Sequence, residues 1–125
     1  MTVTLNIGVM SLESYKKRVL EIARGNYKVS PTEPKIWLTS LDSLAKLLSP
    51  KNKLLLELIR DHHPQSIQEI ASMTGRNKGN ISRTLKRMRN CRMIDLKRKE
   101  KGKLVAEVKF DRIHIEYGLE SPAVA

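Results

Sequence analysis

Apolar residues recur every three or four positions through the middle of the chain, the spacing of one face of a helix. Ser49 directly precedes Pro50, which is a cap followed by the proline of a first helical turn. Ser66 stands three residues before Glu69, as in a capping box, and Asn77 precedes the last repeat. These signals predict three consecutive helices over residues 50–62, 67–74 and 78–90.

The same spacing predicts which residues of these helices face the core. They are Leu54, Leu55, Leu58 and Ile59 in the first helix, Ile67, Ile70 and Ala71 in the second, and Ile81, Leu85 and Met88 in the third. Ala71, Gly75 and Ile81 also have the spacing of a helix-turn-helix. In that motif a small residue lies where the helices cross, a glycine takes positive φ in the turn, and an apolar residue docks the second helix.

After the third helix the apolar period changes from 3.6 to 2, which indicates strands. Ile94 and Leu96 alternate with polar neighbours, as do Leu104, Ala106, Val108 and Phe110. Between the two runs lies the polar segment KRKEKG, in which Gly102 can supply the turn. The pattern predicts a β-hairpin over residues 93–110 with its tip at 97–103.

The amino-terminal part carries shorter patterns. Residues 2–9 alternate like a strand, and Ser11 can cap a helix over 12–24 that Gly25 ends. The apolar face of that helix is predicted to consist of Leu12, Tyr15, Val19 and Ile22. The remaining segments are a linker at 25–35, a short strand at 36–38, a helical pattern at 41–48 and a strand at 112–117.

This order of elements predicts an α+β, mainly helical fold: a winged helix-turn-helix, with a three-helix core and a β-hairpin wing. A short strand–helix extension precedes it. We expect three parts: an extension and linker at 1–35, the winged helix-turn-helix at 36–117, and a flexible tail at 118–125.

Positive charge is concentrated in one segment. The chain has a net charge of +11, and residues 76–103 hold 12 Lys and Arg against the two acids Asp95 and Glu100. The rest of the chain is therefore nearly neutral. A near-neutral body with one intensely basic segment is typical of a protein that binds a polyanion.

The third helix has the chemistry of a recognition helix for DNA. Its face opposite Ile81 gathers Gly79, Arg83, Lys86 and Asn90, and residues 76–94 contain no acid. Arg can grip guanine with two hydrogen bonds, and Asn can pair with adenine. The predicted DNA-binding residues are Asn77, Lys78, Gly79, Asn80, Ser82, Arg83, Lys86 and Arg87 in this helix and Lys97, Arg98, Lys99, Lys101 and Lys103 in the wing.

The run SIQEIASMTGRNKGNISRTLKRMRNCRMIDL resembles the helix, turn, recognition helix and first wing strand of winged-helix transcriptional regulators of the multiple-antibiotic-resistance regulator type. The wider arrangement over residues 36–117 is similar to archaeal and bacterial DNA-binding proteins of this class. The resemblance implies a regulator, such as a repressor, that binds a two-fold operator as a homodimer. Residues 2–9, 12–24 and 112–117 are candidates for the dimer contact, since they lie outside the minimal DNA-binding unit.

Other classes of function find less support. His62 and His63 are adjacent without a second ligand cluster, and Cys91 has no neighbouring base, so we expect no catalytic residue, no metal and no cofactor. A single cysteine fits a reducing cytoplasm. Neither a signal peptide nor an apolar run of the roughly 20 residues that span a bilayer is evident.

Two alternatives remain open. An RNA-binding winged helix could use the same charge, because phosphate attraction does not depend on the sugar, although the scarcity of aromatic residues in the basic segment argues against stacking on single strands. An antitoxin-like protein would hold a partner protein through its amino-terminal part and repress its own operon through its winged helix.

Overall fold

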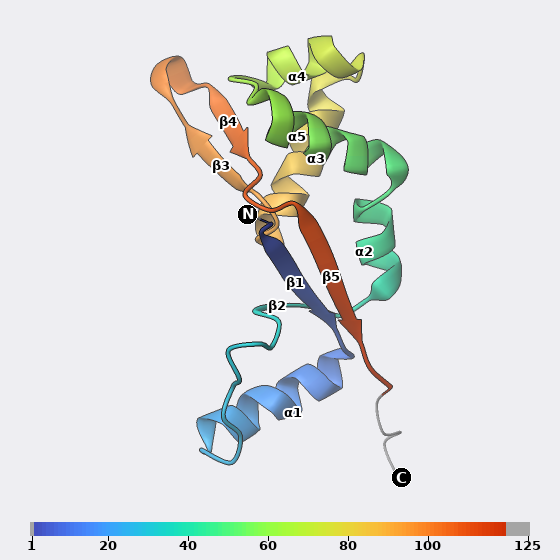
Figure 1. The fold of residues 1–125 in the computed structure, drawn as a ribbon, viewed down its shortest axis with the longest axis vertical. Helices are drawn as coiled ribbons and strands as arrows, with labels where there is room; N and C mark the ends of the chain where they lie inside the picture. The colour runs from blue at the N-terminus through green and yellow to red at the C-terminus, as the bar shows by residue number, and fades with distance from the viewer. Residues whose placement is uncertain (1, 120–125) are drawn as a thin grey trace.

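The computed structural model describes residues 2–119 and has the predicted α+β architecture (Figure 1). Most of the tail predicted at 118–125 lies outside the described residues. The elements are β1 Thr4–Val9, α1 Leu12–Ala23, β2 Ile36–Leu38, α2 Leu41–Leu47, α3 Pro50–His62, α4 Ile67–Thr74, α5 Lys78–Asn90, β3 Asp95–Arg98, a 3₁₀ turn at Glu100–Gly102, β4 Leu104–Glu107 and β5 Arg112–Tyr117.

Helices α3, α4 and α5 and the β3–β4 hairpin form the winged helix-turn-helix. Ile81, Leu85 and Met88 of α5 are fully buried, as their spacing predicts. They pack in one core with residues from α3 and α4, namely Leu55, Leu56, Ile59 and Ile70. Strands β3 and β4 pair antiparallel with Asp95 opposite Glu107 and Arg98 opposite Leu104. The predicted fold class is therefore confirmed.

Several predicted core positions need correction. Leu54 is 67% exposed, while Leu56 is buried, because the core-facing stripe of α3 is rotated toward Asn52, Leu55 and Leu56. Thr84 of α5 is buried beside the predicted apolar residues. In β4 both Val105 and Ala106 are buried, so the expected alternation fails there. Val105 lines a hollow together with residues 63–65.

A second sheet lies beyond the helices, with strand order β2-β1-β5 and all three strands parallel. β1, α1 and β2 form a βαβ unit, and β5 returns along the other side of β1. Ile7, Val9 and Ile36 of this sheet share the core with Leu44 and Leu47 of α2. The sheet thus joins strands from both sides of the boundary predicted at residue 35.

Helix α1 lies at the end of the molecule opposite the wing (Figure 1). Ser11 caps it as predicted, because Ser11 Oγ accepts from the backbone N–H of Ser14 at 3.1 Å. Its apolar face, predicted to consist of Leu12, Tyr15, Val19 and Ile22, is exposed, and none of the residues of α1 is buried. No described segment covers this face.

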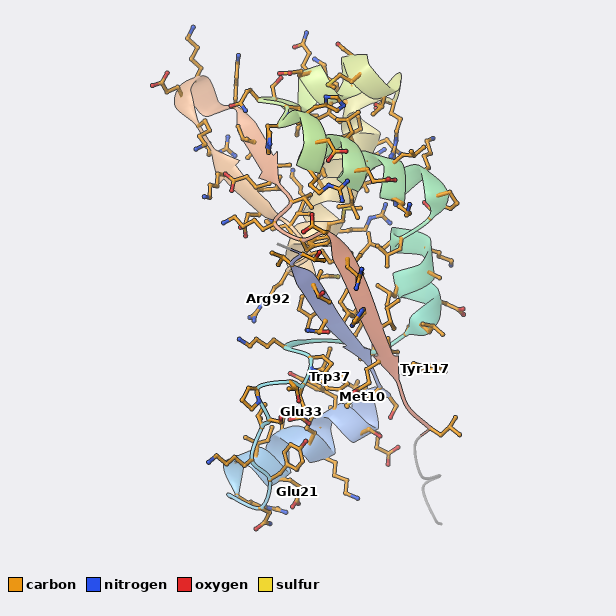
Figure 2. All side chains as sticks on the ribbon, in the orientation of Figure 1. Met10, Glu21, Glu33, Trp37, Arg92 and Tyr117 are labelled. Atoms are coloured by element: carbon orange, nitrogen blue, oxygen red, sulfur yellow. The ribbon has the colours of Figure 1, made fainter. Side chains whose placement is uncertain are left out.

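Polar and aromatic contacts attach α1 to the sheet instead. The Arg18 guanidinium lies 5.0 Å from the centroid of the Trp37 ring and 5.1 Å from that of Tyr27. Its Nη1 is 3.2 Å from Glu33 Oε1, which also accepts a hydrogen bond from the Tyr27 hydroxyl. Figure 2 shows Glu33 and Trp37 between α1 and the sheet. Gly8 leaves room for the Trp37 ring, since a Cβ there would lie 2.2 Å from it.

Candidate nucleic-acid interface

Helix α4 is capped by side chains at its start and ends at a glycine. Ser66 Oγ accepts from the backbone N–H of Glu69 at 3.0 Å, and the Glu69 carboxylate accepts in return from the N–H of Gln65, one residue before the usual position. Gly75 ends α4 with φ +71° and donates to the carbonyl of Ala71, a conformation that favours glycine. These bonds fix both ends of α4 and so the place where the turn to α5 begins.

Asn77 caps α5 through its side chain. Its Oδ1 accepts from the backbone N–H groups of Gly79 at 2.8 Å and Asn80 at 3.3 Å. The amide oxygen is therefore engaged in starting the helix, which leaves the side-chain NH2 as the free part of this predicted DNA-binding residue. The capped turn satisfies two of the amide groups that a helix leaves unpaired at its start.

The outward face of α5 is open and cationic. Lys78, Asn80, Arg83, Lys86 and Arg87 are exposed, and Gly79 and Ser82 are partly buried. The helix contains no acidic residue, and no described carboxylate forms an ion pair with its cations within 4 Å. Gly79, Arg83 and Lys86 lie on the side of the helix opposite the buried Ile81. Lys78, seven residues before the buried Leu85, lies nearer the side of Leu85 at the start of the helix.

Arg76, which lies in the turn between the two caps, connects this face to the core. Its Nη1 donates to Asn52 Oδ1 at 3.2 Å, and its Nη2 donates to Asn80 Oδ1 at 2.5 Å. Asn52 is itself buried and held by Ser49, whose Oγ accepts from the Asn52 backbone N–H at 3.3 Å. Arg76 Nε is buried and has no hydrogen-bond partner among the described residues.

This contact restricts the orientation of the Asn80 side-chain amide. Oδ1 accepts from Arg76 with one of its two lone pairs, so the side chain keeps an acceptor position as well as the donors of its NH2. Pairing with adenine needs both the donor and the acceptor of an Asn amide. Asn80 therefore still carries both kinds of group, in an orientation that Arg76 restricts.

The wing carries its charge mainly at the tip. Lys101 and Gly102 have φ of 60° and 71° and turn the chain, and Lys99, Lys101 and Lys103 are exposed. The two predicted residues in the strand are partly engaged by the wing itself. Lys97 Nζ is 3.5 Å from Glu107 Oε1, and Arg98 Nη1 donates to the carbonyl of Gly102 at 3.1 Å.

One hollow is lined by residues of both the wing and α5. Lys78, Arg98 and Lys103 line it with Ser66, Gln68 and Glu69 of the α4 start. Within it Lys78 Nζ donates to Gln68 Oε1 at 3.4 Å. Arg87 lies elsewhere, in a second hollow near α2 that Lys46 and Asn52 also line. The predicted residues therefore form one group around the start of α5 and the wing, with Arg87 toward α2.

Sequence reasoning missed two cations that the structure places beside this face. Arg76 was counted in the basic segment but not among the DNA-binding residues, although its place between Gly75 and Asn77 marks it as a turn residue held by two caps. Lys46 lies on α2, far from the basic segment in sequence, and joins Arg87 and Asn90 only through the fold. No local signal in the sequence indicates that Lys46 lies near Arg87.

Cys91, His62 and His63, the residues that could suggest catalysis or metal binding, lie at helix ends. Burial raises the pKa of the Cys91 thiol. The backbone N–H of Cys91 bonds to the carbonyl of Arg87 at the end of α5. His63 takes φ 47° at the end of α3. Among residues 2–119 there is no cluster of three or more His, Cys, Asp or Glu side chains placed to hold a metal ion. No helix in this range has the length and apolar character needed to cross a membrane.

Comparison with known protein families gives a match to the segment that carries this interface. Residues 47–115 match the model of the HVO_A0114 family. The chain belongs to the HVO_A0114 family. The matched segment runs from the end of α2 into β5, so the HVO_A0114 region contains the whole winged helix-turn-helix but not β1, α1 or β2.

One similar solved structure is the crystal structure of the predicted DNA-binding transcriptional regulator from E. coli. It has 21% sequence identity and a TM-score of 0.46, and the likeness covers 79% of this HVO_A0114 chain and 84% of the other. A search of curated proteins finds no match.

Proposed function

We propose that the protein is a sequence-specific regulator of transcription that binds duplex DNA without catalysis. Helix α5 enters the major groove, and the tip of the wing contacts the phosphate backbone or the adjacent minor groove. The observation that carries the proposal is the acid-free outward face of α5, which is aimed by capped turns and flanked by the exposed wing cations.

Duplex DNA fits this face better than duplex RNA. A helix such as α5 fits the B-DNA major groove, about 12 Å wide. The deep and narrow major groove of A-form RNA does not admit side chains that read bases. The proposal includes the multiple-antibiotic-resistance regulator type, repression, a cytoplasmic location and action as a homodimer on a two-fold site.

The direct test is a gel-shift titration against the DNA upstream of the protein's own gene. Scrambled DNA and duplex RNA serve as competitors at two salt concentrations. Preferential binding to the upstream DNA that weakens as salt rises would support the proposal. Equal binding to every polyanion would contradict sequence-specific regulation. Purification with a second, tightly bound protein would favour the antitoxin-like alternative.

The wing has its own test. Replacing both Lys99 and Lys101 by Gln should weaken binding to specific and scrambled DNA alike, because phosphate contacts carry no sequence information. The slope of log affinity against log salt should fall by about 0.9 for each phosphate that the wing no longer neutralises. Lys16 and Lys17 of α1, changed together to Gln, are the matched control and should leave the slope unchanged. A weakening confined to the specific site would contradict a backbone role.

A further inference from the structure

Strand β5 is an open edge of the three-stranded sheet. It pairs in parallel with β1 over six residues, from Thr4 opposite Arg112 to Val9 opposite Tyr117, and no described strand lies on its other side. Its side chains are largely exposed, with Ile115 at 46% and Tyr117 at 61%. Figure 2 shows Tyr117 at the far end of the strand, away from the wing.

Strand β5 has neither the lysine, the proline nor the short length that commonly protect an edge. Exposed edge strands are commonly shielded by Lys, Pro or a bulge, or are kept very short, because their free N–H and C=O groups can pair with another chain. The segment RIHIEY contains neither Lys nor Pro and is regular throughout its pairing with β1. By contrast β2, the other edge, has only three residues. An unprotected six-residue edge therefore points to a strand partner.

The sequence of β5 is complementary to itself in the antiparallel direction. Backbone groups of alternate residues point to the same side, so a two-fold axis between two β5 strands must pass through a residue rather than between residues. Centred on His114, the pairing puts Arg112 opposite Glu116 of the second copy and Ile113 opposite Ile115. Each of these favourable pairs occurs twice.

The two neighbouring registers, centred on Ile113 and Ile115, do not pair Arg112 with Glu116. A centre at Ile115 would place Arg112 opposite Gly118, and a centre at Ile113 would place Arg112 opposite His114. Of these three registers, only the one centred on His114 gives each Arg112 a carboxylate directly across the strands.

The side of β5 that faces α3 supports the same arrangement. A cleft of about 440 Å³ runs between α3 and β5, and its apolar wall includes Leu48, Leu56, Phe110, Ile113 and Ile115. In the proposed register the isoleucines of a second copy lie directly beside those of the first. Four isoleucine side chains then extend this wall across the two-fold axis, which removes apolar surface from water.

We infer that two copies of the chain join through β5, antiparallel and centred on His114, to form a continuous six-stranded sheet in the order β2-β1-β5-β5-β1-β2. This inference rests on the homodimer included in the proposed function and names its interface. It is tested without DNA, so a failure here leaves the test of DNA binding untouched.

Cysteine cross-linking tests the register. In a Cys91→Ser background, His114→Cys should form an intermolecular disulfide under mild oxidation. Residues directly opposite in an antiparallel pair lie about 4.5–5.5 Å apart at Cα, within the disulfide range. Ile115→Cys in the same background should stay largely monomeric on a non-reducing gel. Efficient cross-linking by Ile115→Cys alone, or by neither variant, would overturn the inference.

Charge exchange tests the interface in solution. Glu116→Arg places an arginine opposite each Arg112 of the other copy and should raise the dimer dissociation constant about tenfold, as expected for two cross-strand pairs changed from attraction to repulsion. The double variant Arg112→Glu with Glu116→Arg should restore it. Both positions are exposed, so the fold should tolerate the changes. A wild-type monomer in sedimentation velocity, or a double variant no better than the single, would overturn the interface.

Discussion

The winged helix-turn-helix and the amino-terminal βαβ unit use the same kind of apolar periodicity in different ways. In α5 the predicted apolar face is fully buried, while in α1 a face of similar spacing is exposed. Both helices begin at the predicted caps. The difference teaches that periodicity identifies residues that share a face, whereas burial depends on which other elements the fold brings to that face.

The two regions also differ in what holds them. Apolar packing around Leu85 fixes α5 in the core. The contacts of α1 with the sheet centre on one cation, Arg18, with its two aromatic rings and Glu33. Buried apolar contacts contribute more to stability than partly exposed ion pairs, whose contribution is often below about 1 kcal/mol. Helix α1 should therefore be less stably attached than α5, while β1 and β2 share the buried core.

The largest expected effect comes from a matched pair of truncations. Leu85→Ala should lower the free energy of unfolding by about 2–5 kcal/mol, because it leaves a cavity in a fully buried position. Val19→Ala, on the exposed face of α1, should change it by less than about 0.5 kcal/mol. Urea denaturation followed by circular dichroism measures both. A comparable loss of stability in Val19→Ala would show that α1 is covered in solution, by a second copy or another partner.

A change on the outward face of α5 should affect binding and not folding. Arg83→Ala should weaken specific DNA binding by about 1–3 kcal/mol, the usual contribution of one bidentate contact to a base. Lys17→Ala removes one exposed cation from α1 and serves as the control of equal charge. Fluorescence anisotropy with a labelled operator measures both. Equal effects of the two variants would mean that only total charge matters.

A smaller effect is expected from the residue that connects α5 to the core. Arg76→Lys keeps the charge but cannot hold Asn52 and Asn80 together, because a lysine lacks the planar fork of donors. Preference for the operator over scrambled DNA should fall by about 1 kcal/mol, the net contribution of a typical hydrogen bond. The salt dependence should stay the same. Arg89→Lys on the same helix is the control, and an equal decrease in preference there would argue against a positioning role.

The smallest effect is local and depends on pH. The hydrogen bond from the Tyr27 hydroxyl, followed by those from the Ser30 backbone and Arg18, lowers the pKa of Glu33. A carboxyl with a lowered pKa in the folded state contributes stability above its ordinary pKa, and this contribution is lost as pH falls through the lowered value. The attachment of α1 should therefore loosen in acid before the helical core unfolds.

Trp37 reports this step directly, since it is the only tryptophan of the chain and stacks on Arg18. Its fluorescence should change at acidic pH in the wild type. Glu33→Gln should remove the transition, and Glu13→Gln should preserve it. An identical acid transition in Glu33→Gln would assign it to another group.

The sequence alone predicts much of the winged helix-turn-helix, because its signals are local. Caps at Ser49, Ser66 and Asn77, the turn at Gly75 and the change of period after α5 each act within a few residues. The strands β1, β2 and β5 were also predicted, but not their joining into one sheet. That pairing links residues more than a hundred positions apart, and three short apolar runs carry no information on which lies between the others.

The sequence predicts which residue types form the candidate site, but not the contacts that these residues make with other helices. The outward face of α5 follows from helical geometry, so Arg83 and Lys86 could be placed from spacing alone. The engagement of Asn80 by Arg76, and the approach of Lys46 to Arg87, depend on how α2 and α3 pack against the turn. Contacts between separate helices do not produce a repeating pattern in the sequence, so they cannot be predicted from it. The predicted contacts with DNA stay predictions until binding is measured.

The position of β1 in the middle of its sheet has a consequence for how the chain folds during synthesis. β1 is synthesised well before its longest partner, β5, and Val3 is bonded to Asp111 across 108 positions. The winged helix-turn-helix can fold before β5 is synthesised, because residues 50–107 supply all of its elements. Since domains fold as units as they emerge and distant contacts form late, the winged helix-turn-helix should fold on the nascent chain while β1 is paired with β2 alone. Assembly of two copies through β5 would then begin only after β5 has emerged and paired with β1.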